Sequence, residues 1–423
     1  MHAIKVAALA AFVALATAAC ASSPSTPAST AGTTTNDVPA SVLLVSIDGF
    51  RADYLQLGIT PNLDRIAADG VHAAWLTPSY PSLTFPNHYT IVTGLRPDHH
   101  GIVHNTMHDA MLGDFSLGRQ EAVGDGRWWG GEPVWVAAEK AGLPTATLFW
   151  PGSEAAIQGI RPGRWLPYDE TLTASARVDL VLGWLSEPAS SRPRFATLYF
   201  DTLDHESHDH GPDSAEAHAE IRKLDAAIGR LLDGMAARGL ADRVNLVVVS
   251  DHGMATVTPG HVVAVEDMVD PRHARLVTAG QSVGFAPVAG HEAAALEQLL
   301  GRHDHYECWR KDQLPPRWHY GSHPRVPPIV CQRGDGWDAL EPERLAWRDP
   351  DATRGSHGYD PALPAMRAVF IASGPSFREG VVLPPIDNVD VYPLLMRLLG
   401  LPAEPNDGDA EATAGTLMSE SGE

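Results

Sequence analysis

The sequence predicts an α/β fold in which a mainly parallel central sheet is flanked by helices and a smaller cap region is inserted. Strand-like apolar runs alternate with helical patterns along the chain. The runs are residues 42–47, 144–149, 195–200, 244–249 and 368–372. Because they are continuously apolar rather than alternating, we expect strands that are buried on both faces, which is typical of a parallel sheet covered by helices.

Helical patterns separate these runs. They cover residues 61–69, 132–141, 214–239 and 389–399. The third pattern places Ile221, Leu224, Ile228 and Leu231 at helical spacing, which predicts a face that packs into the core. A chain of 423 residues with 44% hydrophobic residues is long enough to bury a large core, so one α/β domain with an insertion is a natural solution.

The amino-terminal segment has the pattern of a secretory signal peptide, which we predict over residues 1–21. A weakly basic start precedes an apolar run and then small residues, and the run is too short to span a membrane as a helix. Two outcomes stay open, namely cleavage after Ala21 and lipidation of Cys20, which would anchor the chain to a membrane. Residues 22–39, rich in Ser, Thr, Ala and Pro, are predicted to form a flexible linker.

The composition changes in the second half of the chain. Residues 270–349 are rich in Pro, His, Trp and Arg and contain Cys308 and Cys331. We interpret this segment as the inserted cap, which leaves the main domain over 40–269 and 350–402. In an exported chain the two cysteines are expected to form a disulfide, with two reduced thiols as the alternative.

The charge of the chain limits its ligands. The formal net charge is −21, and no cluster of Lys and Arg is visible that could neutralise successive phosphates. Binding to duplex nucleic acid is therefore not expected, and a small anionic ligand would need local help from metal cations. The acidic, small-residue-rich tail over 403–423 is predicted to be disordered.

Residues that can bind metal ions follow two of the apolar runs. Asp48 ends the first run, and Asp251 and His252 follow the run 244–249. Open α/β sheets bind ligands outside the carboxyl ends of their strands. We therefore expect these side chains to meet at one edge of the sheet.

Two further segments add ligands of the same kind. Asp204 and His208 are four residues apart, so on a helical turn both can point to one metal ion, and His357 lies in a turn bounded by glycines. Taken alone, the Asp204 segment is equally consistent with a hydrophilic loop that carries incidental histidines. Together, mixed Asp and His sets suit Zn²⁺. The same loop also contains Asp201, His205 and His210.

Thr84 is a candidate nucleophile. It precedes a rigid Pro-containing turn and a segment that has the pattern of a helix start, so its hydroxyl could project into the site. The alternative is that Thr84 is the N-cap of that helix. The two roles are compatible, because a helix N-terminus also lowers the cost of an alkoxide.

Six short motifs occur in order along the chain. They are Ser-Ile-Asp-Gly at 46–49, Thr-Phe-Pro-Asn-His at 84–88, His-Gly-Ile-Val-His-Asn at 100–105, Asp204-x-x-x-His208, Ser-Asp-His-Gly-Met at 250–254 and Gly-Ser-His-Gly at 355–358. This set resembles the nucleotide pyrophosphatase/phosphodiesterase family of the alkaline phosphatase superfamily. The resemblance runs from about residue 42 to residue 399. It implies an alkaline-phosphatase-like fold and a bacterial, exported, periplasmic enzyme.

The resemblance also implies roles for individual residues. It implies two Zn²⁺ ions per chain, one held by Asp48, Thr84, Asp251 and His252 and the other by Asp204, His208 and His357. Thr84 would attack phosphorus and form a covalent nucleotidyl-threonine. Asn105 would donate to a phosphate oxygen, and Phe85 and Tyr168 would enclose a nucleobase. The implied reaction hydrolyses phosphodiester and phosphoanhydride bonds of a nucleotide substrate and releases a nucleoside 5′-monophosphate.

Other functions are compatible with parts of the pattern. The Thr84 motif lacks the Cys or Ser and the Arg of sulfatases, and no third metal set supports a phosphate monoesterase. A choline-phosphoester or lysophospholipid phosphodiesterase would share the metal ligands, and an aromatic cage could hold its quaternary ammonium. Trp128, Trp129 and Trp165 are the cage candidates, with hydrophobic packing as their alternative role. A non-catalytic periplasmic metal- or ligand-binding protein is the hypothesis from another class.

Overall fold

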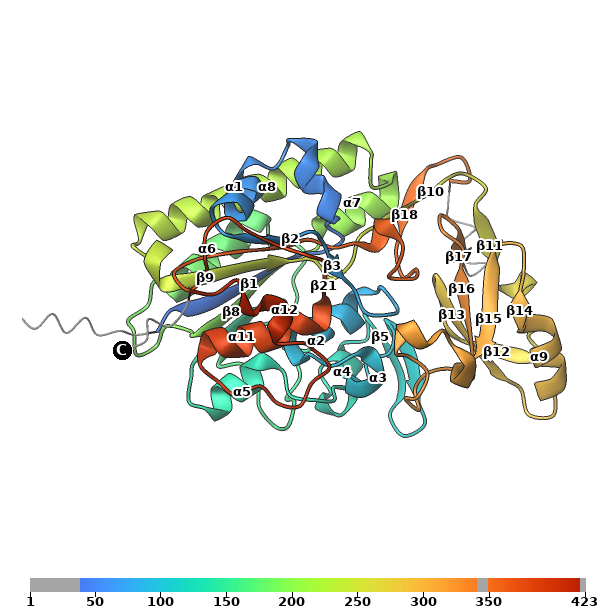
Figure 1. Cartoon of the computed structure of the whole chain (residues 1–423). Coiled ribbons are helices and arrows are strands. Elements are labelled where there is room, and N and C mark those ends of the chain that lie inside the picture. The colour runs from blue at the N-terminus through green and yellow to red at the C-terminus, as the bar shows by residue number, and fades with distance from the viewer. Residues whose placement is uncertain (1–38, 341–348, 419–423) are drawn as a thin grey trace, which may run out of the picture. The chain divides into compact units, whose positions relative to one another are not determined.

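The computed structural model describes residues 39–340 and 349–418, and its centre is an eight-stranded sheet (Figure 1). The strand order is β20-β2-β19-β9-β1-β8-β6-β7. The strands are β1 (Ser41–Ile47), β2 (Val71–Ala73), β6 (Thr145–Leu148), β7 (Arg164–Leu166), β8 (Phe195–Phe200), β9 (Val244–Val249), β19 (Phe370–Ser373) and β20 (Val381–Leu383). Neighbours pair in parallel except at β19, so the expected α/β fold with a mainly parallel sheet is confirmed.

Strand β19 departs from the expectation of parallel pairing. It is antiparallel to both of its neighbours, β9 and β2. The chain arrives at β19 from the segment that carries His357, which lies at the carboxyl ends of the parallel strands, and no crossover helix returns it to the opposite edge. It therefore enters the sheet in the reverse direction.

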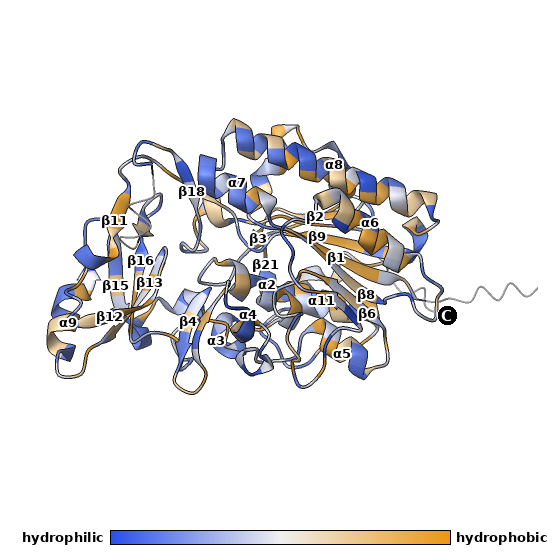
Figure 2. Cartoon of the chain, turned by 180° about the vertical axis from the view of Figure 1, so that it is seen from behind, coloured by the Kyte–Doolittle hydropathy of each residue, from blue (hydrophilic) through white to orange (hydrophobic). Residues whose placement is uncertain are grey.

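Helices cover both faces of the sheet, because both faces of the central strands are apolar. In β1, Leu43 and Val45 pack on the side of α1 (Pro61–Asp69), α6 (Ala174–Leu185) and α8 (Ala215–Ala237). Val42 and Leu44 pack on the side of α2 (Thr84–Thr93), α5 (Val134–Lys140) and α11 (Val391–Leu399). Figure 2 shows these strands as the hydrophobic layer between two-toned helices. The expected helices are present, with small shifts at their ends.

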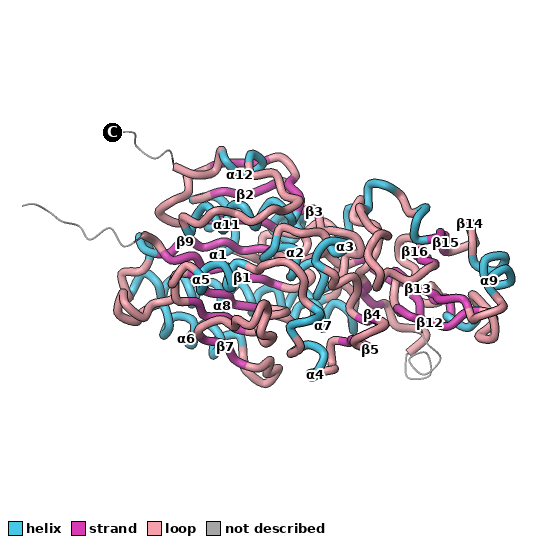
Figure 3. Tube along the Cα trace, turned by 90° about the horizontal axis from the view of Figure 1, so that it is seen from below, coloured by secondary structure: helices cyan, strands magenta, loops and turns pink. Residues whose placement is uncertain are grey.

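A second, antiparallel sheet of five strands has the order β12-β13-β16-β15-β14, and Figure 3 shows it as separate from the eight-stranded sheet. Its elements are β12 (Ala274–Thr278), β13 (Ser282–Pro287), β14 (Gly301–Arg302), β15 (Tyr306–Arg310), β16 (Ile329–Arg333) and the covering helix α9 (Glu292–Leu299). Cys308 and Cys331 face each other on β15 and β16 and form the expected disulfide. The cap boundaries at 270 and 349 stay a prediction.

Shorter elements connect these layers. They are α3 (Pro97–His100), α4 (Gln120–Val123), α7 (Thr202–His210) and α12 (Glu411–Ala414), and the strands β3 (Leu76–Thr77), β4 (Thr106–Asp109), β5 (Gly113–Ser116), β10 (Ala255–Val257), β11 (Val262–Ala264), β17 (Asp338–Leu340), β18 (Arg354–Ser356) and β21 (Ile386–Asp387). In the part of the chain that the structure describes, no helix combines the length and apolar composition needed to cross a membrane.

The carboxy-terminal segment differs from the prediction of disorder over 403–423. Residues 403–418 are packed against the main sheet region and include α12. Asp407 accepts a hydrogen bond from the backbone N of Arg96 at 2.7 Å, and Thr413 and Thr416 are buried. Composition failed as a guide here because long-range contacts anchor the segment. They are the bond from Arg96 to Asp407 and the packing of Ala412 and Leu417 against the main core. The predicted signal peptide and nearly all of the linker lie outside the described residues, as does 419–423.

A buried carboxylate and imidazole cluster at the strand ends

Three adjacent parallel strands deliver most of the candidate ligands to one place. Asp48 directly follows β1, and β1 is flanked by β8, which leads into α7 with Asp204 and His208, and by β9, which leads into Asp251 and His252. His357 follows β18, which pairs with β10 immediately after the Asp251 segment. Parallel strands end at the same edge, so residues distant in sequence meet there.

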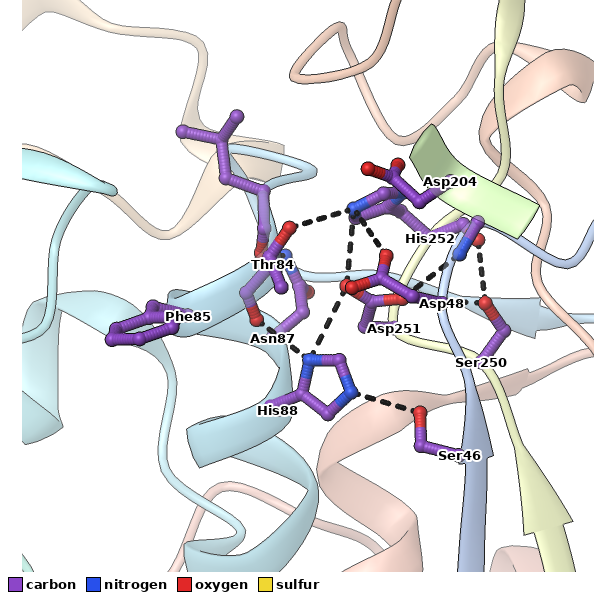
Figure 4. Close-up of polar contacts among 12 residues, drawn as sticks. Ser46, Asp48, Thr84, Phe85, Asn87, His88, Asp204, Ser250, Asp251 and His252 are labelled. Carbon is purple, nitrogen blue, oxygen red and sulfur yellow. Dashed lines mark hydrogen bonds and ion pairs between the residues drawn. The ribbon is translucent and has the colours of Figure 1, made fainter. Parts of the chain in front are cut away.

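The candidate ligands form two groups that share His252. One contains Asp48 and Asp251, and the other contains Asp204 and His357. Figure 4 shows the first group together with Asp204. His252 Nε2 lies 3.0 Å from Asp251 Oδ2 and 3.4 Å from Asp48 Oδ1. Asp204 Oδ2 lies 3.5 Å from His208 Nε2, and Asp204 Oδ1 lies 3.6 Å from His357 Nε2. The rings of His252 and His357 stack at 3.6 Å, which joins the groups.

The three histidines are held in one orientation. Their Nδ1 atoms lie 2.9 Å from Gly355 O for His208, 2.8 Å from Gly253 O for His252 and 2.9 Å from Ser82 O for His357. A carbonyl oxygen only accepts hydrogen bonds, so each Nδ1 carries the proton in the neutral ring. Each Nε2 is thereby left as a lone-pair donor that points into the cluster.

Each of the three carboxylates has one oxygen without a hydrogen bond. Asp48 Oδ1, Asp204 Oδ1 and Asp251 Oδ2 are buried and accept no hydrogen bond, although their residues are 2%, 8% and 0% exposed. Burial and the nearby carboxylates of Asp251 and Asp204 hold the pKa of Asp48 well above its usual range. Buried anions of this kind are stable only when paired or bound to a cation, so the donor set fits divalent metal ions.

Thr84 lies at the edge of this cluster. It is the first residue of α2, and its Oγ1 is 3.3 Å from His252 Nε2. The N-cap of the helix is Leu83 and makes no side-chain capping bond, so the alternative role of Thr84 as N-cap is wrong. Asn87 fixes the preceding turn, because its Nδ2 donates to Pro81 O at 2.9 Å and to Leu83 O at 2.8 Å.

Asn105 is oriented by the first turn of the same helix. Its Oδ1 accepts a hydrogen bond from the backbone N of Phe85 at 3.0 Å. Its Nδ2 has no hydrogen-bond partner among the described residues, so the amide N–H groups remain available to a ligand. The structure therefore places the Asn105 side chain against the backbone N of Phe85, the residue that follows Thr84.

The two aromatic candidates are supported by different neighbours. The Phe85 ring packs 6.0 Å from Phe115 and 5.9 Å from Trp129. The Tyr168 ring is 36% exposed and meets Phe149 edge-on at 5.4 Å. Within residues 39–340 and 349–418 the rings of Phe85 and Tyr168 do not contact each other.

The tryptophans do not form an exposed cage. Trp128 and Trp129 are 2% and 3% exposed and belong to the core, so hydrophobic packing is their role. The guanidinium of Arg161 lies over the ring of Trp165, 5.4 Å from its centroid, in a cation–π contact. This geometry weakens the case for a quaternary ammonium substrate.

Two residues of the site received no role from the sequence. His88 is fully buried, with Nδ1 2.9 Å from Thr84 O and 3.3 Å from Asp251 Oδ2. Tyr199 donates to Asp48 Oδ2 at 2.5 Å. The i, i+4 spacing from Thr84 could have indicated His88, whereas Tyr199 reads as an ordinary strand residue.

The polar residues of the Asp204 segment point in different directions, which the sequence did not show. Asp204 and His208 share a turn of α7 and face the cluster, as expected for the helical alternative. The side chain of His205 is 62% exposed. Asp201 is buried, with its carboxylate turned to Arg177.

Comparison with known proteins identifies related sequences and structures. The model of the type I phosphodiesterase / nucleotide pyrophosphatase family matches residues 42–360. An uncharacterized pyrophosphatase/phosphodiesterase of Schizosaccharomyces pombe is 36% identical, over 89% of this chain and 80% of that protein. The bis(5′-adenosyl)-triphosphatase of Xenopus laevis is 32% identical, over 90% of this chain and 82% of that protein.

Other relatives are longer, and one solved structure is closely similar. Ectonucleotide pyrophosphatase/phosphodiesterase family member 3 of Bos taurus is 35% identical over 88% of this chain, which spans only 43% of that protein. Murine ectonucleotide pyrophosphatase/phosphodiesterase 5, solved as an inactive threonine-to-alanine variant in complex with AMP, has a TM-score of 0.84 and 34% identity. The match covers 90% of this chain and 100% of the murine one.

The alkaline-phosphatase-like α/β fold, with a carboxylate and imidazole cluster at its strand ends, defines a hydrolase. The chain belongs to the type I phosphodiesterase / nucleotide pyrophosphatase family. The hypothesis of a non-catalytic binding protein is thereby set aside.

Proposed function

We propose that this protein hydrolyses nucleotide phosphodiester and phosphoanhydride bonds and releases nucleoside 5′-monophosphates through a covalent nucleotidyl-threonine at Thr84. The observation that carries the proposal is the position of the Thr84 hydroxyl, 3.3 Å from His252 Nε2 at the edge of a buried cluster with unpartnered carboxylate oxygens. A hydroxyl at this position suits nucleophilic attack, whereas metal binding alone would not require one.

The proposed cofactors are two zinc ions per chain. Asp48, Thr84, Asp251 and His252 would hold one ion, and Asp204, His208 and His357 the other. The mixture of carboxylates and correctly oriented Nε2 atoms supports zinc over magnesium or calcium, which prefer all-oxygen sites. When bound, the ions would lower the pKa of the Thr84 hydroxyl and stabilise negative charge on the phosphate oxygens.

The chain's own residues would divide the reaction into two displacements. In the first, Thr84 Oγ1 forms a bond to phosphorus as the bond to the leaving oxygen breaks. In the second, water attacks the phosphorus of the Thr84 ester, which releases the nucleoside 5′-monophosphate and restores the hydroxyl. Asn105 would donate from Nδ2 to a non-bridging oxygen, in the orientation that its bond from Phe85 N imposes.

Nucleotide substrates are favoured over other diesters by the surroundings of Thr84. Phe85 directly follows the nucleophile, and Tyr168 offers a second, partly exposed ring, so together they would enclose a base. The AMP complex of the murine relative and the name of the Xenopus relative support this substrate class. A single-charge diester also needs less neutralisation than a monoester, and no arginine contacts the cluster in the described residues.

We further propose that the protein is exported to an oxidising compartment such as a bacterial periplasm. The disulfide between Cys308 and Cys331 and the amino-terminal pattern over 1–21 support export. Lipidation at Cys20 would add a membrane anchor.

The test of the proposed reaction is release of p-nitrophenol from the p-nitrophenyl ester of thymidine 5′-monophosphate, against p-nitrophenyl phosphate and p-nitrophenyl phosphorylcholine. We expect a strong preference for the nucleoside ester. A preference for the choline ester would keep the site but overturn the substrate class. A preference for the monoester would overturn the assignment as a diesterase.

The variant Thr84→Ala tests the nucleophile. We expect kcat to fall by about 10³-fold or more, because no other hydroxyl can replace Oγ1, while zinc content measured by plasma mass spectrometry is largely retained. Thr258→Ala is the matched control at an exposed threonine and should leave both quantities unchanged. Retained turnover in Thr84→Ala would refute the covalent threonine.

A further inference from the structure

A buried ion pair lies next to the metal cluster but takes no part in it. Arg177 Nη1 donates to Asp201 Oδ1 at 2.5 Å, and the two residues are 2% and 3% exposed. The same guanidinium also donates to the carbonyls of Tyr199 at 3.0 Å and Leu172 at 2.8 Å. A buried ion pair is poor evidence for stability, because desolvation offsets its attraction, so a positioning role is the better explanation.

The second oxygen of the Asp201 carboxylate accepts a hydrogen bond from a partly exposed tyrosine. Tyr168 donates its hydroxyl to Asp201 Oδ2 at 2.5 Å. Burial, and then the hydrogen bond to this carboxylate, raise the pKa of Tyr168, so the hydroxyl stays protonated and remains the donor. Arg177 therefore fixes one oxygen of Asp201, and Asp201 fixes the hydroxyl of Tyr168.

Two further contacts define the orientation of the Tyr168 ring. Phe149 meets it edge-on at 5.4 Å, and the Arg177 guanidinium covers the Phe149 ring at 5.0 Å. The backbone N of Tyr168 donates to Glu154 Oε1 at 3.0 Å. Arg177 thus supports both the hydroxyl end and the edge of a ring that is still 36% exposed.

The position of Asp201 in the chain links this ring to the catalytic cluster. Asp201 directly follows β8 and is the N-cap of α7, the helix that carries Asp204. A carboxylate three residues before a metal ligand, on rigid backbone, can set the distance between an aromatic surface and the reacting phosphorus. Rigid elements give more precise positioning than a free loop.

We propose that Asp201 and Arg177 are positioning residues that lock Tyr168 as the stacking surface for the nucleobase, and so determine the preference for nucleotide over base-free diesters. This inference rests on the proposed function, in which Tyr168 contacts the base. Loss of the lock leaves the ring present but mobile, so base binding weakens while the chemistry at Thr84 is unchanged.

The test measures KM and kcat for two substrates in the zinc-loaded protein, the thymidine 5′-monophosphate p-nitrophenyl ester and methyl p-nitrophenyl phosphate, which has no base. Tyr168→Phe keeps the ring, removes its hydroxyl and leaves the Asp201–Arg177 pair intact. We expect KM for the nucleoside ester to rise about fivefold, the range of one hydrogen bond, with kcat within about twofold. Both constants for the methyl ester should be unchanged.

A double-mutant cycle separates positioning from general damage. Asp201→Asn should raise KM for the nucleoside ester at least as much as Tyr168→Phe, and the double variant should be no worse than Asp201→Asn alone. Tyr392→Phe is the matched control, since it also removes a tyrosine hydroxyl bond, to Glu404 N at 3.2 Å, at a remote helix. It should change neither substrate.

Tyr168→Ala distinguishes failure of the inference from failure of the proposed function. Loss of base stacking should lower kcat/KM for the nucleoside ester by about tenfold or more, with no change for the methyl ester. If Tyr168→Ala has this effect and Tyr168→Phe has none, the lock is refuted and the nucleotide assignment stands. If Tyr168→Ala does not change the ratio of the two substrates, both the stacking surface and its lock are refuted.

Discussion

The eight-stranded sheet and the five-stranded sheet both have histidines near their ends, but among the described residues only the first brings together a cluster that could hold a metal ion. In the first region, His208, His252 and His357 bond to carbonyls through Nδ1 and present Nε2 to buried carboxylates. In the second, His305 stacks on Trp337 at 3.4 Å and His303 stacks on Tyr306 at 4.3 Å. The frequency of histidine is therefore a weak guide to metal binding. The two regions differ instead in whether the Nε2 atoms meet buried carboxylates.

The two regions also differ in what holds them together. The first has two apolar cores, one on each face of the sheet. The second has one small core of its own, which includes both half-cystines, and it also contributes Val330 to a core of the first region. A small core limits how much burial can stabilise it, so a covalent bond contributes more there.

The largest expected effect comes from exchanging a histidine in each region. His208→Ala removes an oriented Nε2 donor, and we expect kcat/KM for the nucleoside ester to fall by about 10³-fold with loss of about one zinc ion per chain. His305→Ala should change both by less than about twofold, because that ring only stacks. Equal losses in the two variants would show that the regions do not differ in this way.

Removal of the disulfide sharpens the comparison of stability. Cys308 and Cys331 are 23 residues apart, so replacing both with Ser should cost about 3 kcal/mol by the loop-closure model. We expect a lower denaturant midpoint with unchanged zinc content and kcat under native conditions. Loss of zinc from the folded variant would instead show that metal binding at the cluster depends on the second region.

A smaller, pH-dependent effect is expected at the contact between the regions. Burial lowers the pKa of His104 to about 4, while its Nε2 lies 3.1 Å from Ser282 O. The folded ring stays neutral where the unfolded one, with a pKa near 6.5, takes up a proton, so stability falls as pH drops from about 6.5 towards 4. At pH 5 the loss from this residue should be about 2 kcal/mol.

The pH effect is measured by urea unfolding at pH 7.5 and pH 5. His104→Gln cannot titrate and should show a smaller difference between the two pH values than the parent protein, even though it is less stable at pH 7.5. An identical difference in both proteins would assign the acid sensitivity to other groups.

Local pattern was sufficient to predict most of the main sheet and most of the residues that cluster at its edge. Continuous apolar runs identified β1, β8 and β9, and each ligand pair directly followed such a run or shared a helical turn. Pattern failed at β19, whose direction depends on where the chain comes from. It also failed at residues 403–418, which are anchored by a long-range hydrogen bond and by packing of Ala412 and Leu417 on the main core. The sequence pattern also could not decide whether Thr84 is the first residue of the helix or its N-cap, because the same residues are compatible with both positions.

The sequence by itself determined five strands of the main sheet, the order of the motifs and the types of candidate ligand, because these depend on short-range periodicity and side-chain chemistry. Only the tertiary structure decided which histidines face carboxylates, which carboxylate oxygens lack partners, and that Asp201 turns away from the cluster to hold Tyr168. Those properties depend on burial and on the register between strands that are distant in the chain. Neither can be derived from the residues of a single segment.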